Sequence, residues 1–142
     1  MQGKALFLLS LQLLLLTACT SVPWEQSVRE KNITAEYFNI AKTYEEQKDY
    51  KKAVEYYKMA MSNKELHDSA YYKSGYCYAL DGNWEQAESV YKNLLQKDSQ
   101  NKNIKCSLAY IAAMKGNLKL AESLYQELVK DNPTDSALLC DY

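Results

Sequence analysis

Three stretches of the sequence share one pattern: DYKKAVEYYKMAM at residues 49–61, NWEQAESVYKNLL at residues 83–95 and NLKLAESLYQELV at residues 117–129. Each has an alanine at its fifth place and a tyrosine four residues later. The alanines are Ala53, Ala87 and Ala121, so successive copies are 34 residues apart. A fixed period of this length is typical of stacked units that each contain two helices joined by a turn.

The apolar spacing around the first stretch predicts those two helices. Upstream of it, Tyr37, Ile40, Ala41 and Tyr44 recur at the i, i+3, i+4, i+7 spacing of one helix face. Within it, the same kind of spacing continues through the tyrosines and alanines of residues 50–61. The sequence therefore predicts a helix on each side of residues 48–49, and the 34-residue period predicts two further pairs.

The expected turns between paired helices also repeat. They fall at Lys48-Asp49, Gly82-Asn83 and Gly116-Asn117. Glycine readily adopts the left-handed backbone that ends a helix, and Asp or Asn is a favoured N-cap for the next one. In the second turn, Asn83 and Gln86 have the spacing of a capping box.

Small residues recur at two places in each unit, which predicts a close approach of the paired helices. These residues are Ala41, Gly75 and Ala109, and then Ala53, Ala87 and Ala121. The pattern resembles the tetratricopeptide repeat family, with a small residue at the eighth place, an aromatic one at the eleventh, Ala at the twentieth and an aromatic one at the twenty-fourth. The units then span residues 34–67, 68–101 and 102–135. The third departs from the family pattern, with Lys105 and Ala112 at aromatic places.

This resemblance implies an all-α fold, a solenoid of three antiparallel helix hairpins. Residues 136–142 would form a short, partial capping helix. They are few, and the preceding segment is rich in leucine, with Leu118, Leu120, Leu124 and Leu128. Because exposed apolar area seeks a partner, we expect self-association through the C-terminal helix.

The first eighteen residues have the features of an export signal. Lys4 gives a positive start, and a mostly apolar run follows at residues 5–16, too short to span a bilayer. Leu16, Thr17, Ala18 and Cys19 then resemble the lipobox of bacterial lipoproteins, which implies cleavage after residue 18 and lipid on the Cys19 thiol. Such lipids hold a protein on a membrane. Thr20 favours the outer over the inner membrane. The alternative is a plain signal peptide with a chance cysteine.

Residues 19–33 are predicted to be a tether. They include Pro23 and show no sustained helical periodicity. A flexible chain of this size reaches about 20 Å, which keeps the repeats close to the bilayer. Trp24 either lies at the lipid headgroups or is simply exposed.

Little in the composition indicates catalysis. The formal net charge of -1 disfavours nucleic-acid binding. There is one histidine, His67, expected at the surface, and no CxxC spacing among Cys77, Cys106 and Cys140. We expect no metal, no cofactor and no enzyme. These three cysteines are expected to be buried as small apolar residues.

The family resemblance also implies where a partner binds, because the first helices of such repeats line a concave groove. The second, fifth, ninth, twelfth and thirteenth places of each repeat contribute most of the groove lining in that family. The expected groove residues are Phe38, Lys42, Tyr72, Tyr76 and Tyr110, with Cys106 also at a fifth place and Lys73 nearby. Clustered tyrosines favour protein contacts, although about half of these rings would serve only to pack helices. Capture of a C-terminal carboxylate is disfavoured, since only Lys73 fits the family's clamp.

The predicted function is therefore a membrane-anchored adaptor lipoprotein that mediates protein–protein interaction in a bacterial envelope assembly. A protein or peptide would bind the groove, and the N-terminal lipid would bind the membrane. Two alternatives stay open: a periplasmic holder of unfolded exported chains, and a thiol-dependent enzyme. The identity of the partner and the membrane leaflet are not set by the sequence.

Overall fold

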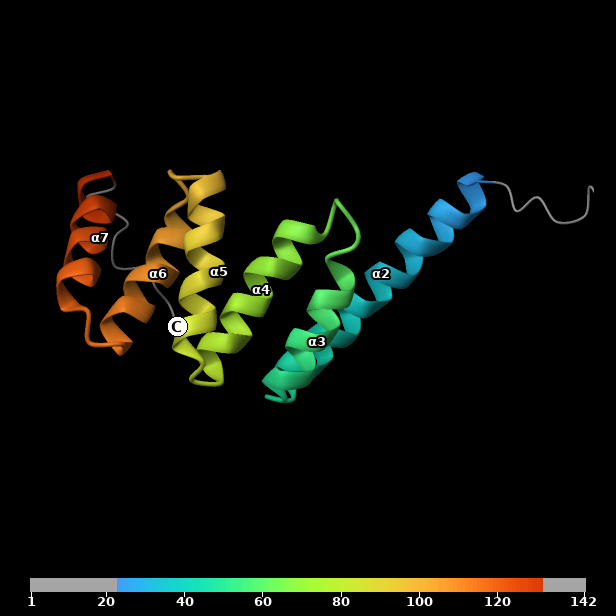
Figure 1. Ribbon diagram of the computed structural model, residues 1–142, viewed down its shortest axis with the longest axis horizontal. Helices are drawn as coiled ribbons and strands as arrows, with labels where there is room; N and C mark the ends of the chain where they lie inside the picture. Colours follow the sequence, from blue (N-terminus) through green and yellow to red (C-terminus); the bar gives the residue numbers. More distant parts are fainter. Residues whose placement is uncertain (1–22, 132–142) are drawn as a thin grey trace, which may run out of the picture. The chain divides into compact units, whose positions relative to one another are not determined.

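The computed structural model describes residues 23–131, in which it contains six helices and no strand. The helices are α2 (Pro23–Glu46), α3 (Tyr50–Ala60), α4 (His67–Leu80), α5 (Trp84–Lys97), α6 (Lys102–Met114) and α7 (Leu118–Asp131) (Figure 1). The predicted all-α fold of three helix hairpins is confirmed. The predicted signal peptide, Cys19 and the capping helix at residues 136–142 lie outside the described residues.

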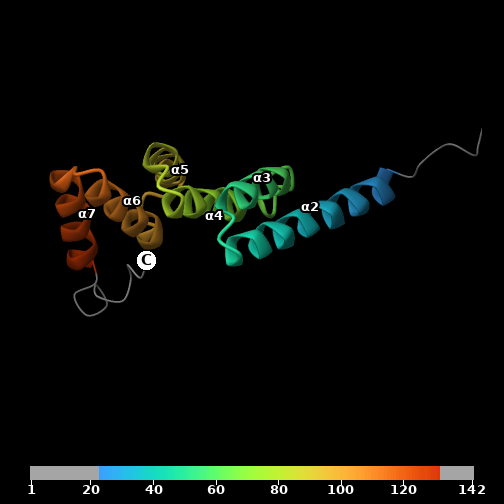
Figure 2. The same ribbon diagram turned by 90° about the horizontal axis from the view of Figure 1, so that it is seen from below.

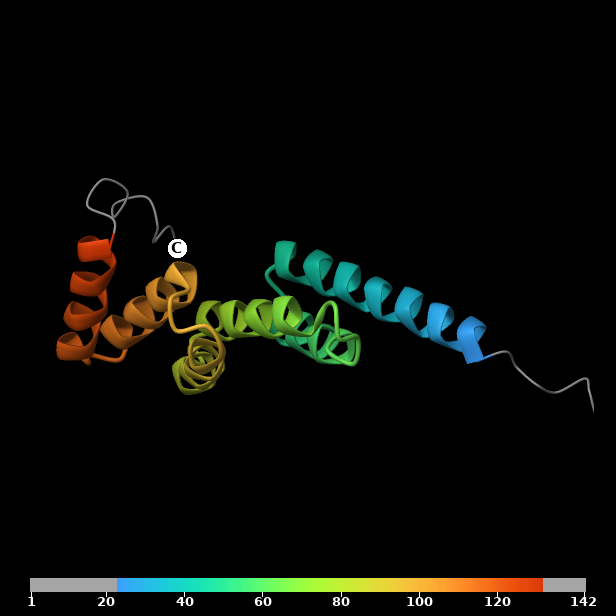
Figure 3. The ribbon, with the colours of Figure 1, turned by 90° about the horizontal axis from the view of Figure 1, so that it is seen from above.

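From α3 onward, each helix packs against the next one along the chain. Figure 1 shows α4 between α3 and α5, and the turned views in Figures 2 and 3 show α6 between α5 and α7. Because each helix has its neighbours in sequence as its neighbours in space, the fold is built from local contacts, as expected of a solenoid. The chain divides into two units, residues 1–32 and 33–142, and the three repeats lie in the second.

Helix α2 begins earlier than the sequence predicted, so the flexible tether at residues 19–33 is wrong for residues 23–33. Pro23 occupies the first helical position, where proline is favoured, and Glu25 lies in the first turn, where a negative charge suits the helix dipole. Residues 24–33 are all exposed. A helix without a buried face shows no apolar period, which is why the periodicity did not reveal it.

The small residues lie where paired helices come closest, as predicted. Ala41, Ala53, Ala87 and Ala109 are fully buried. A Cβ atom placed on Gly75 would lie 2.7 Å from Cγ1 of Val90, closer than real Cβ contacts. Ile40, in contrast, is exposed although it shares the apolar spacing of its neighbours.

Aromatic rings fill the space beside these small residues in an arrangement that repeats with the sequence. Phe38 packs edge-on against the fully buried Tyr57, with ring centroids 5.2 Å apart and planes at 69°. Thirty-four residues later, Tyr72 and the fully buried Tyr91 have the same separation and angle. Edge-on pairs of this kind are a favoured aromatic geometry. Each of the first two repeats therefore has one aromatic ring on its first helix, Phe38 or Tyr72, that packs on a buried tyrosine of its second helix.

The third repeat has a cysteine at the place of this ring. Cys106 is buried and disulfide-bonded, and its partner lies outside the described residues. Cys77 is buried with a free thiol. The prediction of small buried residues is right in burial for Cys77 and Cys106, whereas Cys140 lies outside the described residues. The free thiol expected of Cys106 is wrong, because sequence spacing alone does not reveal disulfide connectivity.

The last described helix, α7, buries only one side. Leu124 and Leu128 are buried, whereas Leu118 and Val129 are exposed at 68% and 48% of their surface. Self-association through this helix stays a prediction.

The turns inside the hairpins have the left-handed backbone that the glycines predicted. The φ angles are +75° at Gly82, +78° at Gly116 and +60° at Lys48. Asp49 accepts a hydrogen bond from the amide of Lys52 and so caps α3. Asn83 occupies the N-cap of α5, but its side-chain amide donates to Asp81 instead. The predicted capping box with Gln86 is therefore wrong.

Replacing Lys48 with glycine is expected to stabilise the protein by about 0.5–1 kcal/mol. A residue with a Cβ atom is strained in left-handed backbone by roughly 1–2 kcal/mol, and glycine removes this strain. Part of the resulting stabilisation is offset because glycine loses more conformational entropy on folding. The measurement is the urea midpoint of unfolding. The matched control is Gly82→Ala, where a Cβ atom would meet no atom within 4 Å, so that only the backbone strain is added. A midpoint lowered by Lys48→Gly would contradict this account of the turn.

Candidate functional site

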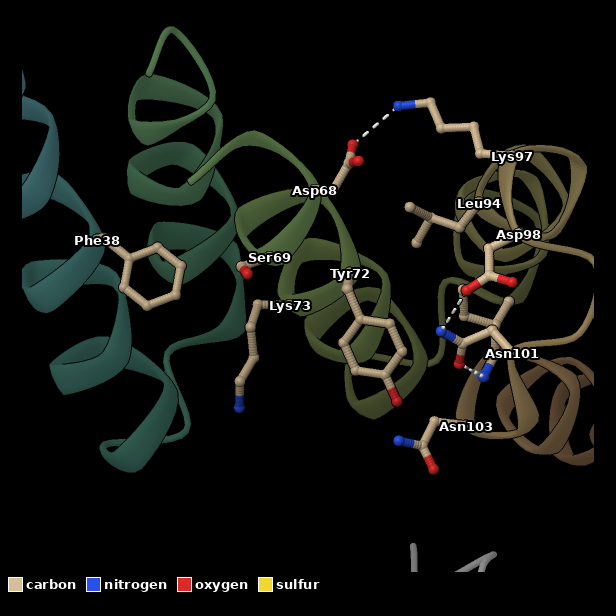
Figure 4. Close-up of a pocket in the computed structure, with 11 residues that line it drawn as sticks. Phe38, Asp68, Ser69, Tyr72, Lys73, Leu94, Lys97, Asp98, Asn101 and Asn103 are labelled. Atoms are coloured by element: carbon tan, nitrogen blue, oxygen red, sulfur yellow. Dashed lines mark hydrogen bonds and ion pairs between the residues drawn. The ribbon is translucent and has the colours of Figure 1, made fainter. Parts of the chain in front are cut away.

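A pocket of about 600 Å³ opens on the first helices of the repeats. It extends from α2 across α4 to the loop between α5 and α6 and the start of α6 (Figure 4). Its lining is Phe38, Asp68, Ser69, Tyr72, Lys73, Leu94, Lys97, Asp98, Asn101, Asn103 and Ile104.

The apolar part of the pocket is formed by side chains that pack against the core of the repeats. Leu94 and Ile104 are buried beneath it, while Phe38 and Tyr72 are half-buried and packed edge-on against buried tyrosines. The hydroxyl of Tyr72 also lies 3.2 Å from Oγ of the buried Ser107, which ties this ring to α6. Rings held in this way lose little conformational entropy when a ligand covers them.

One cation of the pocket, Lys73, is held by a mostly buried carboxylate. Its Nζ donates to Oε1 of Glu45 at 2.8 Å, and the Glu45 side chain is only 17% exposed. Tyr57 donates its hydroxyl to the other oxygen of Glu45 at 2.6 Å, and the Cys77 thiol lies 3.9 Å from the same oxygen. Burial, and then the Glu45 charge, raise the pKa of Cys77 to about 12. Glu45 therefore connects α2, α3 and α4.

The other cation, Lys97, is paired as well. Its Nζ donates to Oδ1 of Asp68 at 2.8 Å, and Nδ1 of His67 lies 2.8 Å from the same oxygen. The hydrogen bonds from Lys97 and His67 lower the pKa of Asp68. Asp98, by contrast, accepts a bond from the side-chain amide of Asn101 at 3.1 Å. Asn101 in turn caps α6 by accepting from the amide of Ile104 at 3.2 Å.

Comparison with known families agrees with the repeats seen in the structure. Two family models, both described as tetratricopeptide repeat, match residues 38–102 and residues 78–139. The chain belongs to the tetratricopeptide repeat family. No match was found among curated proteins. Tetratricopeptide repeats bind proteins or peptides, so the repeats indicate a role in protein–protein interaction.

The pocket of this tetratricopeptide repeat protein contains half of the groove residues expected from the sequence. Phe38, Tyr72 and Lys73 line it. Lys42 is exposed on α2 outside it, and Tyr76 lies beside Lys73, whose Nζ is 5.3 Å from its ring centroid. Tyr110 packs against Trp84 of α5 at 6.3 Å between ring centroids. The 34-residue period aligns equivalent positions, but it does not set which of them a pocket reaches.

Several pocket residues were not expected from the sequence. Asn103 occupies the second place of the third tetratricopeptide repeat, as Ser69 does in the second repeat, so the family positions could have found it. Asp98 and Asn101 lie at the end of α5 and in the linker that follows. No repeat position marks them, because the linker conformation decides that they face the pocket.

The described thiols are not arranged for catalysis. The Cys77 thiol, with a pKa of about 12, stays protonated at neutral pH, and Cys106 is in a disulfide. His67 is ten residues from Cys77 on α4, about 15 Å along the helix axis. Within residues 23–131, no group of three or more His, Cys, Asp or Glu side chains could hold a metal ion.

Proposed function

We propose that this tetratricopeptide repeat protein is a lipid-anchored adaptor of a bacterial envelope, which holds a polypeptide segment of a partner in the pocket between α2 and α6. The pocket is the observation that carries the binding part of this proposal. Its half-buried rings, Phe38 and Tyr72, pack on buried tyrosines, and Tyr72 also packs against the core cluster that contains Leu94 and Ile104. Rigid aromatic anchors of this kind commonly provide most of the binding energy of a protein interface.

Two observations support export and anchoring. Leu16 to Cys19 form the lipobox pattern, and Cys106 is disulfide-bonded. Disulfides persist in oxidising compartments such as the periplasm and are rare in the cytosol. None of the helices within residues 23–131 is long and apolar enough to cross a membrane. In the proposed adaptor, the lipid of Cys19 attaches the chain to the membrane.

Replacing Cys19 with serine is expected to release the protein from the membrane. Serine offers no thiol for the lipid, and the loss of two or three acyl chains removes about 0.8 kcal/mol of membrane affinity for each buried methylene. The measurement is incorporation of labelled palmitate together with fractionation after carbonate washing. Ser21→Ala, next to the lipobox, is the matched control and should keep both label and membrane. Membrane attachment of the Cys19→Ser protein after the wash would overturn the anchoring proposal.

A further inference from the structure

We infer that the pocket selects an internal segment of its partner in which a basic side chain stands beside apolar ones, and that it disfavours acidic segments and free C-terminal carboxylates. This inference rests on the proposed function of the pocket as a polypeptide-binding site. It names the chemistry of the bound segment, which the tetratricopeptide fold does not set.

The lysines that line the pocket already have carboxylate partners. Lys73 is paired with Glu45 and Lys97 with Asp68, each at 2.8 Å. The Lys73 ammonium also lies 5.3 Å from the ring centroid of Tyr76, which stabilises it further. A ligand carboxylate would therefore have to compete with an intramolecular carboxylate that needs no ordering on binding. The pocket offers no surplus of positive charge to an acidic ligand.

The surplus charge of the pocket is negative and lies at Asp98. The Asp98 carboxylate accepts a hydrogen bond from the uncharged side-chain amide of Asn101. Within the described residues, no lysine, arginine or histidine forms an ion pair with it. Asp98 is also the C-cap of α5. The C-terminal end of a helix carries a partial negative charge of its own, so the carboxylate and the helix end add at one place. A ligand cation would be attracted by both charges. Figure 4 shows Asp98 beside Leu94, among the residues that line the pocket.

The neighbours of Asp98 fit the rest of such a segment. Leu94 and Ile104 give the apolar base, and Tyr72 gives an aromatic wall. Asn103, exposed at the start of α6, can donate to and accept from a peptide group of the ligand. A segment that continues in both directions satisfies these groups without bringing a terminal charge into the pocket.

The test measures fluorescence anisotropy of three labelled peptides with the full-length chain in detergent. The peptides share leucine and glycine positions and carry lysine, serine or glutamate at the others, with acetylated and amidated ends. We expect the lysine peptide to bind about five-fold tighter than the glutamate peptide, a factor typical of partly exposed charge pairs. The preference should shrink as salt is added.

Three variants assign the preference to the pocket. Asp98→Asn should weaken binding of the lysine peptide and leave the serine peptide unchanged. Glu45→Gln keeps an acceptor for Tyr57 but releases Lys73, so it should strengthen binding of the glutamate peptide. Glu122→Gln makes the same change of net charge on α7, outside the pocket, and should have no effect.

The outcomes separate this inference from the proposed function. If all three peptides bind equally and Tyr72→Ala weakens them equally, the pocket binds polypeptide but the charge selection is wrong. If the glutamate peptide binds best, the selection is reversed and the inference is overturned. If none of the peptides binds in a manner that depends on Tyr72, both the inference and the proposed binding site fail.

Discussion

Replacing Tyr91 with alanine is expected to lower the free energy of unfolding by about 3–5 kcal/mol. The ring is fully buried and packs edge-on against Tyr72 at 5.2 Å. It also lies against the backbone of α4, since a Cβ atom on Gly75 would come 3.2 Å from its Cζ atom. Alanine would leave a cavity where α4 and α5 are closest, and the surrounding helices can collapse only in part. Because domains of this size are stable by roughly 5–15 kcal/mol, much of the stability would be lost.

Chemical denaturation followed by circular dichroism measures this loss. Tyr125→Ala is the matched control, since Tyr125 holds the equivalent position in the third repeat but is only half-buried. It should cost clearly less than Tyr91→Ala. A loss below about 1 kcal/mol for Tyr91→Ala would mean that the second repeat is not packed around this ring.

The stability of the protein is expected to fall steeply as the pH rises from about 9 to 12. Folding raises the pKa of the Cys77 thiol from 9.0 to about 12, mainly by burial and then by the Glu45 charge. Burial, and then the hydrogen bond to Glu45, also raise the pKa of the Tyr57 hydroxyl above its ordinary value of 10.0. The unfolded chain loses these protons first, so ionisation favours unfolding. The stabilisation is complete below pH 9 and is lost as the pH approaches the folded-state values. For Cys77 alone it corresponds to roughly 4 kcal/mol at the limit.

Urea midpoints between pH 7 and pH 11 give the measurement. Tyr57→Phe and Cys77→Ala should each lower stability at pH 7, because they remove a hydrogen bond or buried volume. Each should also make the decline at high pH less steep than in the wild type. If the double variant declined with the wild-type slope, the two groups would not titrate as the structure requires.

The sequence predicted the parts of the fold that depend on packing between repeats. Ala53, Ala87 and Ala121 recur because two helices cannot approach closely around a larger side chain, and all three are buried. Gly82 and Gly116 recur because the turn needs a positive φ. Such constraints act at every repeat, so they leave a period that is visible without a structure.

Features that occur once were harder to predict. The helix at residues 23–33 has no buried face, so no apolar period marks it. Lys105 stands where the repeat pattern has an aromatic residue, and it is buried. Its Nζ forms an ion pair with Oε2 of Glu127 on the neighbouring helix α7, at 3.1 Å.

The candidate site shows the same division. Phe38 and Tyr72 follow the period and line the pocket, whereas the charges that decide its chemistry depend on the three-dimensional contacts. Lys73 was expected to face a ligand, but its ammonium is held by Glu45, which lies 28 residues away in the sequence. Asp98 reaches the pocket only through the conformation of the linker after α5.

Site-specific photo-crosslinking in intact bacterial cells tests the central claim, that the pocket holds a partner protein. A photoreactive residue is placed at Ser69, which lines the pocket, or at Ser89, which is exposed on α5 and lies in a different surface hollow. If the pocket holds a partner protein, we expect a discrete crosslinked protein from position 69, absent from position 89, and strongly reduced when Tyr72→Ala is combined with the probe at position 69. Equal crosslinking from both positions, or crosslinking at position 69 that does not depend on Tyr72, would contradict it.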